Sequence, residues 1–73
     1  QGKAFITSCF NHHDYAVRES ALKAFLSLEA EPSEIRKYCE ILSDDNSSII
    51  STIAKEKIQS ILEETKNIDI SNN

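Results

Sequence analysis

The chain has 73 residues, of which 40% are hydrophobic and 27% are charged, and its formal net charge is −4. This is the composition of one small globular domain, and it excludes an intrinsically disordered chain. An acidic chain without a run of Lys and Arg repels phosphate, so neither nucleic acid nor an anionic membrane is an expected partner. No apolar stretch approaches the roughly 20 residues that span a bilayer.

The two cysteines, Cys9 and Cys39, both fall within apolar helical patterns. Two such residues do not make a disulfide framework, and a free thiol in this setting behaves as a small hydrophobic side chain. We therefore expect a reducing, intracellular environment and a cytoplasmic protein. The chain begins with Gln rather than Met, which is typical of a segment of a longer protein.

Two helices are expected in the first half of the chain. Over residues 3–10, apolar side chains recur at a spacing of three to four, which predicts the first helix. A second helix is predicted over residues 15–28. Asp14 is a good N-cap for it, because its carboxylate can accept hydrogen bonds from the first free N–H groups of the helix.

Two more helices are expected in the second half. Pro32 suits the first turn of a third helix, whose apolar pattern covers residues 34–42. The fourth helix is predicted over residues 47–64. Residues 67–73 are polar and carry few apolar side chains, and we expect them to form a flexible tail.

The two halves of the chain repeat each other. Ala21 and Ala54 lie 33 positions apart. The same offset aligns four other pairs of apolar positions: Val17 with Ile50, Phe25 with Ile58, Leu28 with Ile61, and Cys9 with Leu42. Repeats of this length are typical of solenoids, in which stacked units cover each other's apolar faces. The predicted fold is all-α, with two stacked antiparallel helical hairpins over residues 3–28 and 34–64 in a domain of residues 1–66. The eight residues Val17, Ala21, Phe25, Leu28, Ile50, Ala54, Ile58 and Ile61 form its expected repeat core.

Part of the sequence resembles HEAT repeats. Residues 11–26 combine an acidic turn with Val-Arg and Ala-Leu pairs, as the turn and second helix of a HEAT repeat do, and residues 41–54 resemble the same element in a following repeat. The offset of 33 is shorter than the roughly 40–47 residues usual for this class. It is closer to the compact HEAT-like repeats of phycobilin-lyase-type and DNA-glycosylase-type solenoids. The Trp, Gly and Tyr positions of tetratricopeptide repeats are missing.

The resemblance also implies a polar ladder between adjacent repeats. In HEAT-like repeats an Asp in the turn and a basic residue six positions later link neighbouring units. Arg18 matches the basic position of the first repeat and Asp45 matches the acidic position of the second, whereas His12 and Ser51 depart from the pattern. We expect Arg18 to reach Asp45, directly or through the turn backbone. The alternative is that Arg18 is simply solvated.

One cluster carries residue types that could support chemistry, namely Cys9, His12, His13 and Asp14. Such residues could bind zinc or form a Cys–His nucleophile. However, Cys9 aligns with the apolar Leu42 of the other repeat, which favours a core thiol beside solvated histidines. We therefore predict no catalytic, cofactor-binding or metal-binding residues.

The expected function is a protein–protein interaction module or scaffold segment of HEAT-like type, without catalysis. Two hairpins are fewer than the roughly three repeats that a stable solenoid needs, and Phe5 and Ile6 look exposed at the start of the chain. We expect a protein partner, or self-association through an end face of the solenoid. The alternative is a small nucleic-acid-binding domain that uses residues 33–61 as a helix-turn-helix.

Overall fold

The computed structural model describes the backbone of residues 2–71 and the side chains of residues 2–64. Four α-helices and one short 3-10 helix follow one another: α1 (Lys3–Ser8), η1 (Cys9–Asn11), α2 (Tyr15–Ser27), α3 (Pro32–Leu42) and α4 (Ser48–Ser71). Within the described backbone there is no β-strand. The prediction of an all-α chain with four packed helices is therefore confirmed.

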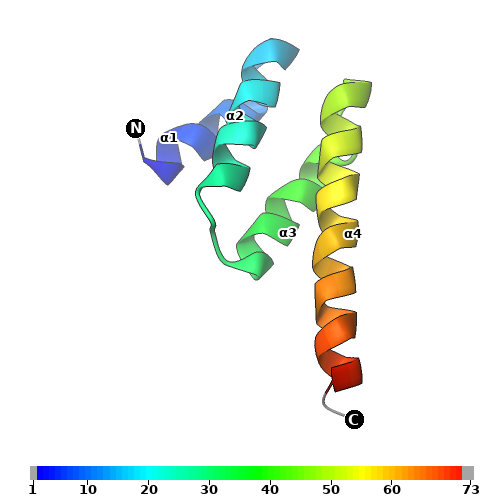
Figure 1. Cartoon of the computed structure of the whole chain (residues 1–73). Helices are drawn as coiled ribbons and strands as arrows, with labels where there is room; N and C mark the ends of the chain where they lie inside the picture. The colour runs from blue at the N-terminus through cyan, green and yellow to red at the C-terminus, as the bar shows by residue number, and fades with distance from the viewer. Residues whose placement is uncertain (1, 72–73) are drawn as a thin grey trace.

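The helices form two hairpins that follow the same path. In Figure 1, α1 and α3 each lead up to a turn, and α2 and α4 each run down from it, side by side. The Cα atoms span 46 × 26 × 14 Å. The shortest dimension fits two layers of helices at the usual separation of about 8–10 Å between axes.

Local signals set most of the helix ends. The carboxylate of Asp14 accepts a hydrogen bond from the N–H of Ala16 at 2.9 Å, which caps α2 as predicted. Pro32 occupies the first turn of α3, where its missing N–H costs nothing. Between these helices Glu29 has a φ of 56°. This left-handed conformation ends α2 sharply, and it is one that glycine adopts with less strain.

The core lies between the two hairpins. Three aromatic rings meet there, and the ring centroid of Phe25 lies 5.6 Å from that of Phe10 and 5.4 Å from that of Tyr38. The side chains of Phe25 and Leu22 are completely buried. The remaining buried residues are Phe10, Ala21, Ile35, Cys39, Leu42, Ile50, Ala54 and Ile61. Five of the eight expected repeat-core residues belong to this set: Ala21, Phe25, Ile50, Ala54 and Ile61.

The other three expected core residues lie nearer the surface. Leu28 is 45% exposed, because α2 ends one residue earlier and the chain turns away there. Val17 and Ile58 are half-buried. Leu22 and Phe10 are buried in the core although the repeat aligns them with the polar Lys55 and Ser43.

Helix boundaries differ from the predictions at both ends of the chain. The first helix changes to a 3-10 turn at Cys9, so Phe10 lies in η1 rather than in α1. At the other end α4 continues to Ser71 instead of ending near residue 64. No Gly or Pro follows Ile61 to stop it. Most of the predicted tail, residues 67–71, is thus helical, while residues 72 and 73 lie outside the described part of the chain.

Candidate functional site

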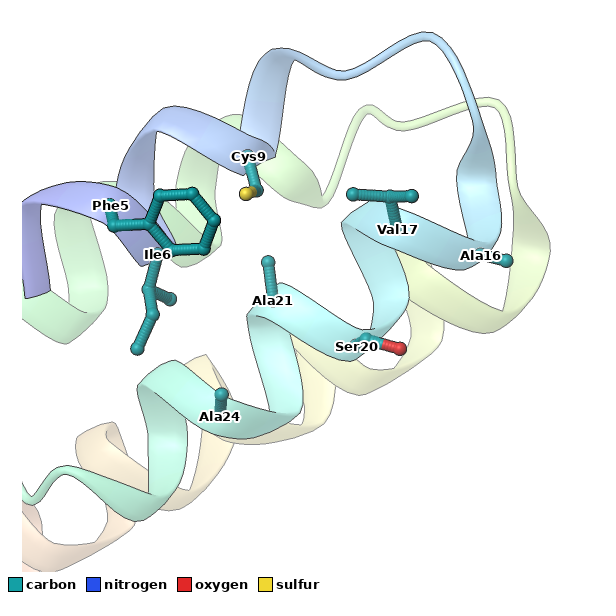
Figure 2. A pocket seen from close by; sticks show the side chains of 8 residues that line it. All are labelled: Phe5, Ile6, Cys9, Ala16, Val17, Ser20, Ala21 and Ala24. Carbon is teal, nitrogen blue, oxygen red and sulfur yellow. The ribbon is translucent and has the colours of Figure 1, made fainter. Parts of the chain in front are cut away.

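An apolar groove lies on the outer side of the first hairpin, between α1 and α2. Its volume is about 470 Å³. Figure 2 looks into it from the side opposite to α3 and α4, which lie behind the first hairpin. The groove is lined by Phe5, Ile6, Cys9, Ala16, Val17, Ser20, Ala21 and Ala24. The hydroxyl of Ser20 is the one oxygen among these side chains, so the lining suits an apolar partner.

Small residues on α2 make the groove. Ala16, Ser20 and Ala24 are spaced by four positions and therefore lie on one face of the helix. They leave a shallow floor, while the larger side chains Phe5 and Ile6 stand on the α1 side (Figure 2). Phe5 is 62% exposed, the most exposed of the large hydrophobic side chains of residues 2–64. The sequence-based expectation that Phe5 would be exposed agrees with this placement.

The matching face of the second hairpin is covered. The counterparts of Ile6, Cys9, Val17 and Ala21 at the offset of 33 are Cys39, Leu42, Ile50 and Ala54. Their side chains are at most 2% exposed. They belong to the core cluster that Phe10, Leu22 and Phe25 of the first hairpin complete. Four of the groove's lining positions thus repeat an internal packing face, without a hairpin on top of them, whereas the counterpart of Ala16, Ile49, is 52% exposed.

A two-pronged ion pair joins the turns of the two hairpins. Arg18 donates from Nε to Oδ2 of Asp45 at 2.8 Å and from Nη2 to Oδ1 at 2.9 Å. The remaining guanidinium nitrogen, Nη1, donates to the backbone carbonyls of His12 and His13 at 2.7 and 3.1 Å. The structure therefore brings together the two residues that the resemblance to HEAT repeats paired.

The ion pair is shielded from water. The side chains of Arg18 and Asp45 are 12% and 8% exposed. The hydrogen bonds from Arg18 lower the pKa of Asp45, and this effect outweighs the burial that would raise it. Asp45 also accepts a hydrogen bond from the N–H of Ser47 at 2.9 Å. The carboxylate thus fixes both the junction between the hairpins and the turn that precedes α4.

The candidate chemical cluster is divided between two places. Cys9 is half-buried in the groove, whereas the rings of His12 and His13 stack at 4.6 Å in the turn. His12 accepts a hydrogen bond from the N–H of Asp14 at its Nδ1 atom, and Asp14 caps α2. Among residues 2–64, no three His, Cys, Asp or Glu side chains come together in a way that could hold a metal ion. The contacts of these residues are therefore groove lining for Cys9, ring stacking for the two histidines, and helix capping for Asp14.

Cationic side chains are dispersed and mostly paired. Lys3, Lys23 and Arg36 form ion pairs of 2.9–3.0 Å with Glu34, Glu19 and Glu40, respectively. The ammonium group of Lys37 lies 5.2 Å from the ring centroid of Tyr38. In the helix that a helix-turn-helix would use for recognition, Lys55 is exposed and Ser51 is half-buried. These placements do not create a basic surface.

A second, more polar hollow of about 460 Å³ lies beside the ion pair, between the two turns. Tyr15 and Ile49, which are 57% and 52% exposed, stand on its rim. Sequence reasoning identified neither hollow. The sequence contains one usable signal for the apolar groove. Ala16, Ser20 and Ala24 form a helix face of small side chains, and none of them belongs to the predicted core.

Comparison with known proteins identified no relative: no protein-family model, no curated protein and no solved structure matches this chain. None of the helices in the described residues has the length and apolar character needed to cross a membrane.

Proposed function

We propose that this chain is a protein-interaction module of HEAT-like, α-solenoid type, without catalysis of its own. The observation that carries the proposal is the apolar groove between α1 and α2, in which four lining positions have completely or almost completely buried counterparts in the second hairpin. An exposed apolar hollow costs solvation free energy, and such surfaces on small domains mark contacts with other proteins.

Two further observations support the HEAT-like assignment. The hairpins follow parallel paths with an offset of 33 residues, as stacked repeats do. The Arg18–Asp45 pair links the turns at the positions that the resemblance assigns to a polar ladder. The alternative, a nucleic-acid-binding domain, has no comparable observation in its favour, and a gel shift on duplex DNA at low salt tests it directly.

A capture experiment with one charged substitution tests the proposal. Ala24→Arg places a cation in the groove, at a helix position where Arg is well tolerated. The matched control is Ser60→Arg, which introduces the same side chain at an exposed position of α4. Circular dichroism should report folded proteins in both cases.

We expect immobilised wild-type chain and the Ser60→Arg control to retain the same protein from an extract, and Ala24→Arg to lose it. The purified protein should then bind wild type in isolation and show the same discrimination. Equal retention by all three forms would exclude the groove as the binding surface.

A further inference from the structure

The nature of the groove's occupant can be argued from the way in which the two hairpins pack. The face formed by Cys39, Leu42, Ile50 and Ala54 is covered by large side chains of the first hairpin, and the whole set forms one core. The groove repeats that face at the offset of 33 residues, with Ile6, Cys9, Val17 and Ala21 in equivalent places. The shape that fits the groove is therefore another helical hairpin in the same register.

The opposite end of the chain has a different character. In the first hairpin, Phe10, Leu22 and Leu26 belong to the core or pack against it. Their counterparts in the second hairpin are polar: Ser43, Lys55 and Gln59. The counterpart of Phe25 is Ile58, which is apolar but half-buried. Lys55 and Gln59 are exposed, and the hydroxyl of Ser43 donates to the carbonyl of Glu40 at 2.7 Å. A polar outer face is the property of a terminal repeat that ends a stack. A second copy of the chain therefore lacks the large apolar side chains at the positions of Phe10, Leu22 and Leu26 that would fill the groove from head to tail.

The two turns give a further condition on the occupant. His12 accepts the N–H of Asp14 as Asp45 accepts the N–H of Ser47, at 3.0 and 2.9 Å, and the two pairs are related by the same offset of 33. His12 thus occupies the place of Asp45. A neutral ring that accepts at Nδ1 carries its hydrogen on Nε2 and donates there. At the junction of the two hairpins, Arg18 donates hydrogen bonds to Asp45. At the equivalent position above His12 the roles are reversed, so an occupant of the groove should present a hydrogen-bond acceptor to His12.

Building on the proposed function, we propose that the groove binds a helical hairpin of a partner protein, stacked on the first hairpin as the first hairpin stacks on the second. The partner's second helix presents large apolar side chains at the positions of Leu22, Phe25 and Leu26, and an amide or carboxylate oxygen at the position of Arg18. The outer side of the second hairpin ends the stack, which gives the assembly a direction.

The first hairpin itself provides the probe. Residues 1–33 are duplicated ahead of the full chain, so that the added hairpin keeps the offset of 33 residues. The added copy carries Arg18→Gln, to present an acceptor to His12, and Cys9→Ala, to leave the original Cys9 as the reporter in the groove. Cys39 is completely buried, and peptide mass spectrometry separates its reaction from that of Cys9.

The readout is the rate at which Cys9 reacts with a water-soluble thiol reagent. Covering the groove should slow this reaction by about tenfold or more relative to wild type, because the thiol then reacts only after local opening. The matched control adds Leu22→Lys and Leu26→Gln to the duplicated hairpin, the residues that the second hairpin carries at these positions. The control should react at the wild-type rate. A form in which the copy keeps Arg18 should be less protected than the Gln form.

Three results would overturn the proposal: a wild-type rate in the extended chain, equal protection in the extended chain and its control, or stronger protection with Arg18 than with Gln. Protection of Cys9 in wild type that grows with protein concentration would also overturn it, since a second copy would then fill the groove. If protection fails while a partner still discriminates Ala24→Arg from Ser60→Arg, the interaction module stands and the hairpin does not.

Discussion

The guanidinium of Arg18 and the carboxylate of Asp45 form a two-pronged ion pair, with hydrogen bonds of 2.8 and 2.9 Å across the junction of the two hairpins. Because Nη1 of the same guanidinium also binds the turn carbonyls of His12 and His13, one side chain connects two turns that are distant in sequence. Planar, two-pronged recognition of this kind requires arginine.

Arg18→Lys should therefore lower the melting temperature by several degrees. A lysine ammonium retains the charge but cannot occupy both carboxylate oxygens and the two carbonyls together. The control is Arg36→Lys, whose partner Glu40 lies one helical turn away on the surface. Thermal unfolding followed by circular dichroism should place the control at the wild-type temperature. Equal melting temperatures of all three forms would mean that the Arg18–Asp45 pair adds nothing to the stability of the fold.

Acid should weaken the fold partly through Asp45. Its pKa is lowered in the folded chain by the hydrogen bonds from Arg18, whereas an unfolded Asp titrates near pH 4. The stability from this group is fully present above about pH 4 and is lost as the pH falls through the lower, folded pKa. Urea unfolding between about pH 5 and pH 2 should show a smaller acid-induced loss for Asp45→Asn than for wild type. Parallel pH profiles would contradict this assignment.

Glu29→Gly should stabilise the chain by about 1 kcal/mol. Glu29 has a φ of 56°, where a Cβ atom is strained and glycine is not. Denaturant unfolding measures the change, and Glu31→Gly is the control because Glu31 has a φ of −58°. A destabilised Glu29→Gly chain would show that the side chain has a compensating role.

Leu22 and Leu28 should respond very differently to truncation. Leu22 is completely buried, and Leu22→Ala should cost about 2–5 kcal/mol, enough to unfold a domain of this size in part. Leu28 is 45% exposed, and Leu28→Ala should cost less than about 1 kcal/mol. Urea titration of both variants tests the placement of the core. Similar costs would mean that Leu28 is a core residue after all.

The pairing of Arg18 with Asp45 was predicted from the resemblance to HEAT repeats. The periodicity of apolar residues was sufficient to predict the four helices, because helix spacing is a local pattern. It could not predict which face of each helix is covered. Ile41 lies within the apolar pattern of the third helix, yet it is 60% exposed, because the adjacent Leu42 takes the inward position. Burial depends on which hairpin lies next to a face, and this is a tertiary property.

The groove could not be predicted for the same reason. Cys9 and Val17 align with the buried Leu42 and Ile50, so the repeat alone assigns all four to the core. In the structure, only the second hairpin has a neighbour on that side. The predicted end of the fourth helix at residue 64 was too early, because residues 60–71 contain no Gly or Pro to stop the helix.

If the groove of the first hairpin binds another protein, apolar side chains that are equally exposed elsewhere on the chain should not contact that protein. Phe5 and Ile41 provide a matched comparison, since their side chains are 62% and 60% exposed and only Phe5 lines the groove. A photoreactive phenylalanine analogue is placed at each position in turn, and the chain is irradiated in an extract. We expect a discrete cross-linked partner from position 5 that Ala24→Arg abolishes, and none from position 41. Equal cross-linking from both positions, or a product at position 5 that persists with Ala24→Arg, would contradict it.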